Sequence, residues 1–76
     1  MLYNIPAREV EAIRQEYDYF TVGNTGRFTT AIFNAFISAD MQNYHRLASA
    51  YPVHAYVIAE NHRVQFLDKF NIVNNA

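Results

Sequence analysis

The decisive stretch of the chain is FTTAIFNAFISADMQNYHRLASAYPVHAY, from Phe28 to Tyr56. Its first part repeats apolar residues at the spacing of an α-helix: Phe28, Ala31, Ile32, Ala35, Phe36 and Ala39. Phe33 and Ile37 cover a second side of the same helix and leave only a narrow polar strip. A helix that is apolar nearly all round is buried, so this spacing predicts a helix over 27–39 at the centre of the fold or against another subunit.

Two residues divide the rest of this stretch into further helices. Asp40 interrupts the apolar pattern and is suited to accept hydrogen bonds from the first amides of a helix over 41–51. Pro52 ends that helix, because proline disfavours helical geometry at the residue before it. Proline is also well placed at the first position of a helix, so we expect the next helix over 52–61. A short helix or an extended segment is expected to follow through Phe70.

Upstream of this stretch, the sequence predicts a helix over 6–19. Its apolar residues recur at spacings of three and four, and they are Pro6, Val10, Ile13, Tyr17 and Phe20. Asn4 is placed to cap this helix, and the glycine-containing segment 21–26 predicts a loop after it. We therefore expect an all-α fold, a small bundle of three to four helices in a single domain over 1–73, with a frayed tail at 74–76.

The last third of the chain also admits an alternative with β structure. Segments 53–58 and 64–67 are rich in residues that favour strands. The polar residues Glu60, Asn61 and His62 could form a turn between them. An α+β fold with a C-terminal hairpin therefore stays open beside the all-α fold.

The composition limits how so short a chain can be stabilised. The chain has 76 residues, of which 51% are apolar and 16% aromatic, and this composition is inconsistent with intrinsic disorder. It has no cysteine, which excludes disulfides and the cysteine-based zinc sites that stabilise many small domains. Dense packing or self-association is then the remaining way to stabilise the fold. We expect a homodimer in which Phe33 and Ile37, on the second apolar side of the helix over 27–39, make the contact.

Charge and hydropathy bear on partners and location. Six basic and seven acidic residues give a net charge of −1, which disfavours nucleic acid as the partner. The longest uninterrupted apolar run, Ala55–Ala59, has five residues, far fewer than the roughly 20 of a membrane helix. The N-terminal sequence becomes acidic where a signal peptide would become apolar. We expect a cytoplasmic protein that does not contact a membrane.

Residues that could carry catalysis or bind a metal are poorly arranged in the sequence. His45, His54 and His62 are separated by nine and eight residues, so no two of them share a helical turn, and we expect no metal or other cofactor. Ser49 lies four residues after His45, but no nucleophile motif surrounds it. We expect a protein without enzymatic activity.

A nucleic-acid-binding accessory protein is the alternative function. It would use Arg46, His54 and Arg63, together with His45. Tyr44, Tyr51 and Tyr56 could stack on bases. Core packing explains Tyr44 and Tyr51 more simply, since both lie on the apolar face of the helix over 41–51.

The pattern of the decisive stretch resembles that of small uncharacterised helical proteins encoded by bacteriophages. The matching positions are Phe28, Ala31, Ile32, Phe33, Ala35, Ala39, Asp40, Asn43, Leu47, Tyr51, Pro52, Ala55 and Tyr56. This resemblance covers about thirty residues and implies the order helix, cap, helix, proline, helix. It also implies a small accessory protein, located in the host cytoplasm, that binds a host protein or protein complex. An inhibitor of a bacterial defence system, such as an anti-CRISPR protein, is one such role.

Four carboxylates on the helix over 6–19 are the candidate partner-binding residues for that role. They are Glu9, Glu11, Glu16 and Asp18. A surface formed by these side chains would complement a basic nucleic-acid channel in a host effector.

Overall fold

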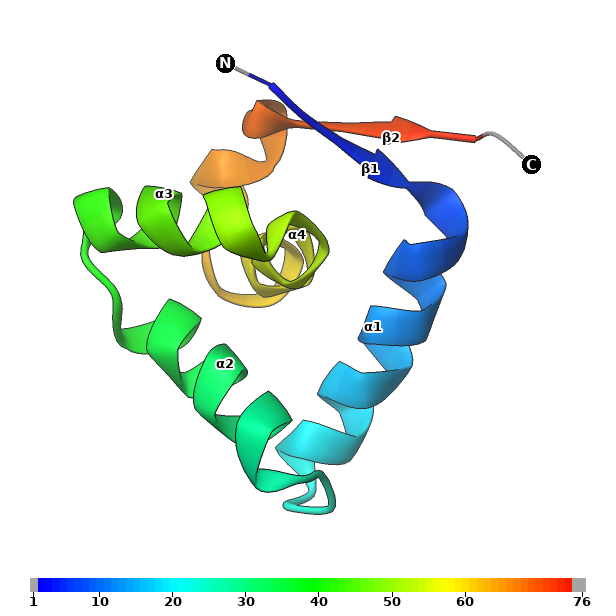
Figure 1. Cartoon of the computed structure of the whole chain (residues 1–76), viewed down its shortest axis with the longest axis vertical. Helices are drawn as coiled ribbons and strands as arrows, with labels where there is room; N and C mark the ends of the chain where they lie inside the picture. The colour runs from blue at the N-terminus through cyan, green and yellow to red at the C-terminus, as the bar shows by residue number, and fades with distance from the viewer. Residues whose placement is uncertain (1, 75–76) are drawn as a thin grey trace.

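The chain folds as helices around one central helix, and a small sheet joins its two ends (Figure 1). The computed structural model describes residues 2–74. Its elements are β1 (Tyr3–Pro6), α1 (Ala7–Thr21), α2 (Arg27–Ser38), α3 (Met41–Ala50), α4 (Pro52–His62), the 3-10 helix η1 (Val64–Lys69) and β2 (Phe70–Val73). The four predicted α-helices are confirmed, each within two residues of its predicted ends.

Local signals explain where the α-helices begin and end. The backbone amide of Asn43 donates to the Asp40 carboxylate over 2.8 Å, which confirms Asp40 as the cap of α3. Pro52 occupies the first turn of α4, as predicted. Between α1 and α2, Gly23 adopts a positive φ of 72°, a backbone conformation that glycine enters without steric cost. The loop predicted over 21–26 is therefore confirmed for residues 22–26.

The all-α prediction is wrong in one respect, because the ends of the chain form a parallel two-stranded sheet. Strand β1 pairs with β2 so that Tyr3 lies opposite Phe70 and Pro6 opposite Val73. Asn4 does not cap α1; it accepts a hydrogen bond of 3.0 Å from the side chain of Asn71 across the two strands. The side chain of Ile5 is fully buried beneath the sheet, with Val10 and Val53.

The alternative α+β fold is confirmed in so far as strands are present, but its C-terminal hairpin is wrong. Segment 53–58 lies in α4 and segment 64–67 lies in η1, so no C-terminal hairpin forms. Strand-forming residues sit in a helix here because burial on several sides outweighs their intrinsic preference. Of the tail predicted at 74–76, Asn74 has no regular structure, and residues 75–76 lie outside the described part of the chain.

The central element is α4, rather than the helix over 27–39. It packs against α1, α2, α3, η1 and β1. Its side chains at Ala55, Val57, Ile58 and Ala59 are fully buried. The small side chains at 55 and 59 lie one helical turn apart, and such residues let neighbouring elements approach closely.

Polar residues of α4 reach partners on the surrounding helices. Glu60 interrupts the apolar pattern, and its two carboxylate oxygens accept hydrogen bonds from the Arg14 guanidinium over 3.0 and 2.5 Å. This paired geometry fixes the position of α1 against α4. At the end of α4, the hydroxyl of Tyr17 lies 2.6 Å from Nε2 of His62.

Helix α2 buries one face in the core. Ile32, Phe33 and Phe36 are buried, whereas Phe28 is 68% exposed. The ring of Phe33 contacts the rings of Tyr17 and Phe20 at 5.4 and 5.2 Å between centroids. The assignment of Phe33 to a dimer contact is therefore corrected, because its side chain is enclosed within one chain. Self-association through Ile37, which is partly buried, stays a prediction.

We expect Phe33→Ala to lower the free energy of unfolding by about 3–5 kcal/mol, because it removes a fully buried ring and leaves a cavity. Phe28→Ala, on the exposed side of the same helix, serves as the control and should change it by less than about 0.5 kcal/mol. Urea unfolding followed by circular dichroism measures both. Equal losses in the two variants would contradict this description of α2.

Stability should also fall at alkaline pH because of Tyr44. This phenol is fully buried, donates to the Ala55 carbonyl over 2.6 Å, and burial raises its pKa to about 12. The folded protein thus holds this proton more tightly than the unfolded chain, whose tyrosine pKa is about 10. The stabilisation is complete below about pH 10 and is lost as the pH rises toward 12.

The matched variant is Tyr44→Phe, which lacks the ionising group. Its free energy of unfolding should fall less between about pH 9 and about pH 11 than that of the native chain. Burial also raises the pKa of Tyr17 and of Tyr56, so part of the decline should persist. An identical decline in both proteins would contradict the assignment to Tyr44.

Candidate functional site

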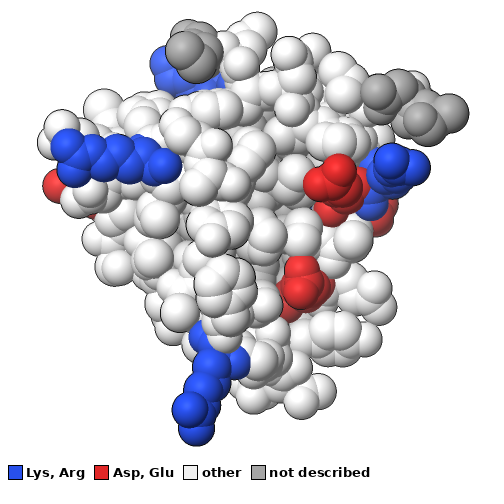
Figure 2. All heavy atoms as spheres, in the orientation of Figure 1, with Lys and Arg blue, Asp and Glu red and all other residues white. Residues whose placement is uncertain are grey.

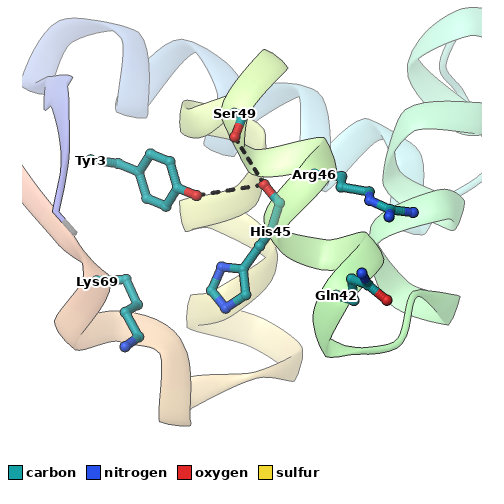
Figure 3. Close-up of a pocket in the computed structure, with 6 residues that line it drawn as sticks. All are labelled: Tyr3, Gln42, His45, Arg46, Ser49 and Lys69. Atoms are coloured by element: carbon teal, nitrogen blue, oxygen red, sulfur yellow. Dashed lines mark hydrogen bonds between the residues drawn. The ribbon is translucent and has the colours of Figure 1, made fainter.

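A groove with basic side chains lies where α3 meets η1 and β1. Its volume is about 570 Å³, and we call it the basic groove. Figure 3 shows its lining residues, which are Tyr3, Gln42, His45, Arg46, Ser49 and Lys69. Three of the six carry a basic group, and none carries a carboxylate.

Helix α3 supplies four of these residues from one face. Gln42, His45, Arg46 and Ser49 follow the spacing i, i+3, i+4 and i+7, which places them side by side along a helix. Tyr44 and Ala48 lie on the other face of α3 and are fully buried. The core therefore fixes which side of α3 is turned toward the groove.

Residues from the two ends of the chain complete the groove. Tyr3 comes from β1, and its hydroxyl lies 3.5 Å from the backbone carbonyl of His45. Lys69 is the last residue of η1, directly before β2. Since β1 pairs with β2, the sheet holds Tyr3 and Lys69 beside the same face of α3.

Packing also orients the imidazole of His45. Its ring makes edge contacts with Tyr44 and Phe66, with centroid distances of 5.9 and 5.7 Å. In Figure 3, His45 lies between Lys69 on one side and Arg46 on the other. The groove thus has a basic group at its middle and one toward each side.

The positive charges of the groove have no acidic partner within residues 2–74. The ion pairs in that range join Arg14 to Glu11 and Glu60. Arg46 donates to the neutral side-chain oxygen of Asn43 over 3.3 Å. Arg46 and Lys69 therefore remain available to bind an anionic ligand.

One face of the molecule carries few charged side chains. Figure 2 shows that most of the face seen in Figure 1 is uncharged and that its few charged side chains are scattered. The net charge of −1 gives the chain no overall positive field. Recognition of an anion must therefore rest on local contacts such as those in the basic groove.

The structure separates the residues proposed for nucleic-acid binding. It places His45 and Arg46 in the basic groove, but Arg63 is used within the fold. The Arg63 guanidinium donates to the Ile37 carbonyl over 3.1 Å and to the Ala39 carbonyl. It also lies 5.5 Å from the centroid of the Tyr44 ring. Arg63 thus satisfies carbonyls at the C-terminal end of α2, where a cation is favourable.

His54 lies outside the groove. It packs against the rings of Phe33 and Tyr51, with centroid distances of 5.5 and 5.7 Å. Burial lowers its pKa, an effect that the nearby charge of Glu16 opposes. This histidine is therefore part of the packing between α2 and α4.

The four carboxylates proposed for partner binding do not form one surface. Glu9 and Glu16 lie on one side of the buried stripe of α1, about 200° around the helix from Glu11 and Asp18. Glu9 lines a hollow beside His54, whereas Asp18 lines another beside Glu60. Glu11 is paired with Arg14. A partner could contact one pair of carboxylates more readily than all four.

The geometry around Ser49 does not match nucleophilic catalysis. Its hydroxyl donates to the backbone carbonyl of His45 over 3.1 Å, so it is not bonded to the imidazole. Within residues 2–74, no three side chains from histidine, aspartate and glutamate lie close enough together to hold a metal ion. In the same range, no helix has the length and apolar character needed to cross a bilayer.

No pattern in the sequence pointed to Lys69 or Tyr3 as lining residues. Helical spacing joins Gln42 and Ser49 to Arg46, so these two could have been found from the α3 pattern. Tyr3 and Lys69 approach α3 only through the pairing of β1 with β2, which local periodicity does not reveal.

Comparison of the chain with protein-family models, curated proteins and solved structures gives no match. The resemblance to bacteriophage proteins therefore stays a prediction.

The structural assignment of Arg63 can be tested by stability. We expect Arg63→Gln to lower the free energy of unfolding by about 1–3 kcal/mol, because charge-assisted hydrogen bonds to the end of α2 are lost. Arg46→Gln is the matched control and should change it by less than about 0.5 kcal/mol, since Arg46 is exposed. Denaturant unfolding compares the two. An unchanged stability in Arg63→Gln would contradict the assignment.

Proposed function

We propose that this protein is a non-enzymatic accessory protein that acts by binding an anionic macromolecule through the basic groove. The observation that carries this proposal is the composition of the groove, which gathers His45, Arg46 and Lys69 with no carboxylate among its lining residues. The chain as a whole carries a net charge of −1, so this local concentration of positive charge is not a consequence of overall composition.

The rigid placement of the lining residues supports the same proposal. The lining residues come from β1, α3 and η1, which the sheet and the core hold against one another. A site on packed elements loses little conformational freedom when it binds, so more of the contact energy is realised as affinity. Gln42 adds an amide that can donate to an anion beside the charged groups.

The basic groove is also compatible with the bacteriophage origin that the sequence predicts. We propose a phage-type protein in the host cytoplasm whose partner is a host protein complex, with inhibition of a bacterial defence system such as a CRISPR effector as its role. Such effectors hold nucleic acid, which would present the anionic surface to the groove. In this proposal the groove, rather than the divided carboxylates of α1, makes the main contact.

The proposed binding is tested with two variants of equal charge. Arg46→Glu with Lys69→Glu reverses the groove, and Arg8→Glu with Arg27→Glu reverses two exposed arginines outside its lining residues. We expect the groove variant to leave a heparin column at clearly lower salt than the control variant, because electrostatic contacts weaken steeply with salt. Equal elution of the two variants would overturn the proposal.

The proposed inhibition of a defence system is tested by a separate infection experiment. A bacterium with an active CRISPR system should be infected more efficiently by a targeted phage when it produces this protein. The groove variant should lose that effect and the control variant should keep it. If the native chain leaves infection unchanged, the role in defence inhibition is wrong, while the proposed anion binding is judged by the column experiment.

A further inference from the structure

We infer that the ligand of the basic groove is single-stranded nucleic acid, held by its phosphates and by at least one unstacked base. This inference rests on the proposed function, because it names the anionic macromolecule that the groove binds.

The size of the groove is the first reason. A volume of about 570 Å³ is far larger than one phosphate group requires and falls within the range of sites for small organic molecules. A ligand that fills the groove would therefore carry a bulky part beside its anion. A nucleotide unit, with a phosphate, a sugar and a base, satisfies this condition.

The number of cations is the second reason, and it separates single strands from duplexes. Arg46 and Lys69 are the groove's two permanent charges, with His45 between them. Proteins that bind duplexes often neutralise roughly six to ten phosphates, which these residues cannot do. A strand that crosses α3 would meet one cation on each side of His45, which matches one or two phosphates.

The aromatic side chains of the groove are the third reason. Tyr3 and His45 both line it, and packing against Phe70 and Phe66 holds their rings in place. Exposed bases of single strands stack on such rings, whereas the bases of a duplex are already stacked on one another. The neighbouring amide of Gln42 can bond to the polar edge of a base.

The inference is tested by titrating the isotope-labelled full chain with an oligonucleotide of about 12 nucleotides and following amide chemical shifts. Both DNA and RNA strands are used, because each carries the same phosphates and bases. We expect the largest shifts along α3 and around Lys69. The same oligonucleotide, carrying a fluorophore, gives affinities from anisotropy between about 50 and 200 mM salt.

Salt dependence then separates the roles of the residues. Two phosphate contacts predict a slope of about −1.4 in log K against log salt, and Arg46→Gln or Lys69→Gln should each reduce its magnitude by about 0.7. Arg27→Gln, outside the groove, should leave affinity and slope nearly unchanged.

Tyr3→Leu should weaken binding about fivefold or more at an unchanged slope, because it removes stacking rather than charge. Tyr3→Phe keeps the ring and should bind like the native chain.

The outcomes that would overturn the inference differ from those that would overturn the proposed function. If heparin or polyglutamate binds through Arg46 and Lys69 but millimolar oligonucleotide causes no shifts, the inference is wrong and the proposed function stands. Equal or tighter binding of a duplex, or of a single mononucleotide, would also overturn it. If no polyanion binding depends on these two cations, both proposals fail. Circular dichroism of the Tyr3 variants checks that each is folded.

Discussion

Burial of α4 on several sides organises the other elements of the fold. Four of its side chains, at Ala55, Val57, Ile58 and Ala59, have no exposed surface, and five other elements pack around it. Removal of so much apolar surface from water is the main stabilising contribution available to a chain with no cysteine. Each surrounding element must then present an apolar face inward, which determines what it presents outward.

The outward faces follow from this arrangement, and α3 is the clearest case. Tyr44 and Ala48 are directed into the core, so the polar residues on the opposite side of α3 are directed toward η1 and β1. The pairing of β1 with β2 then places Tyr3 and Lys69 beside them. The basic groove is thus a consequence of packing, and its lining residues are held by the same contacts that stabilise the fold.

Packing also determines which arginines are available to a ligand. Arg14 is bound to Glu60 and Arg63 to carbonyls at the end of α2, so both contribute to the fold. Among residues 2–74, Arg46 has only a neutral partner, Asn43 on its own helix. A count of basic residues does not distinguish these roles, because the side chains are chemically identical and differ only in their surroundings. The proposed binding function depends on this distinction.

The helices and their ends follow from interactions between residues that are close together in the sequence. Asp40, Pro52 and the glycine-containing loop act on the backbone within a few residues, so their effects could be predicted without knowledge of the fold. The sequence also grouped His45 and Arg46, since they are neighbours in the chain. Long-range packing makes α4 the central helix, pairs β1 with β2 in parallel and brings Lys69 to the groove. Those features depend on contacts between residues far apart in the chain, such as Arg14 with Glu60 and Tyr3 with Phe70, which local periodicity does not encode.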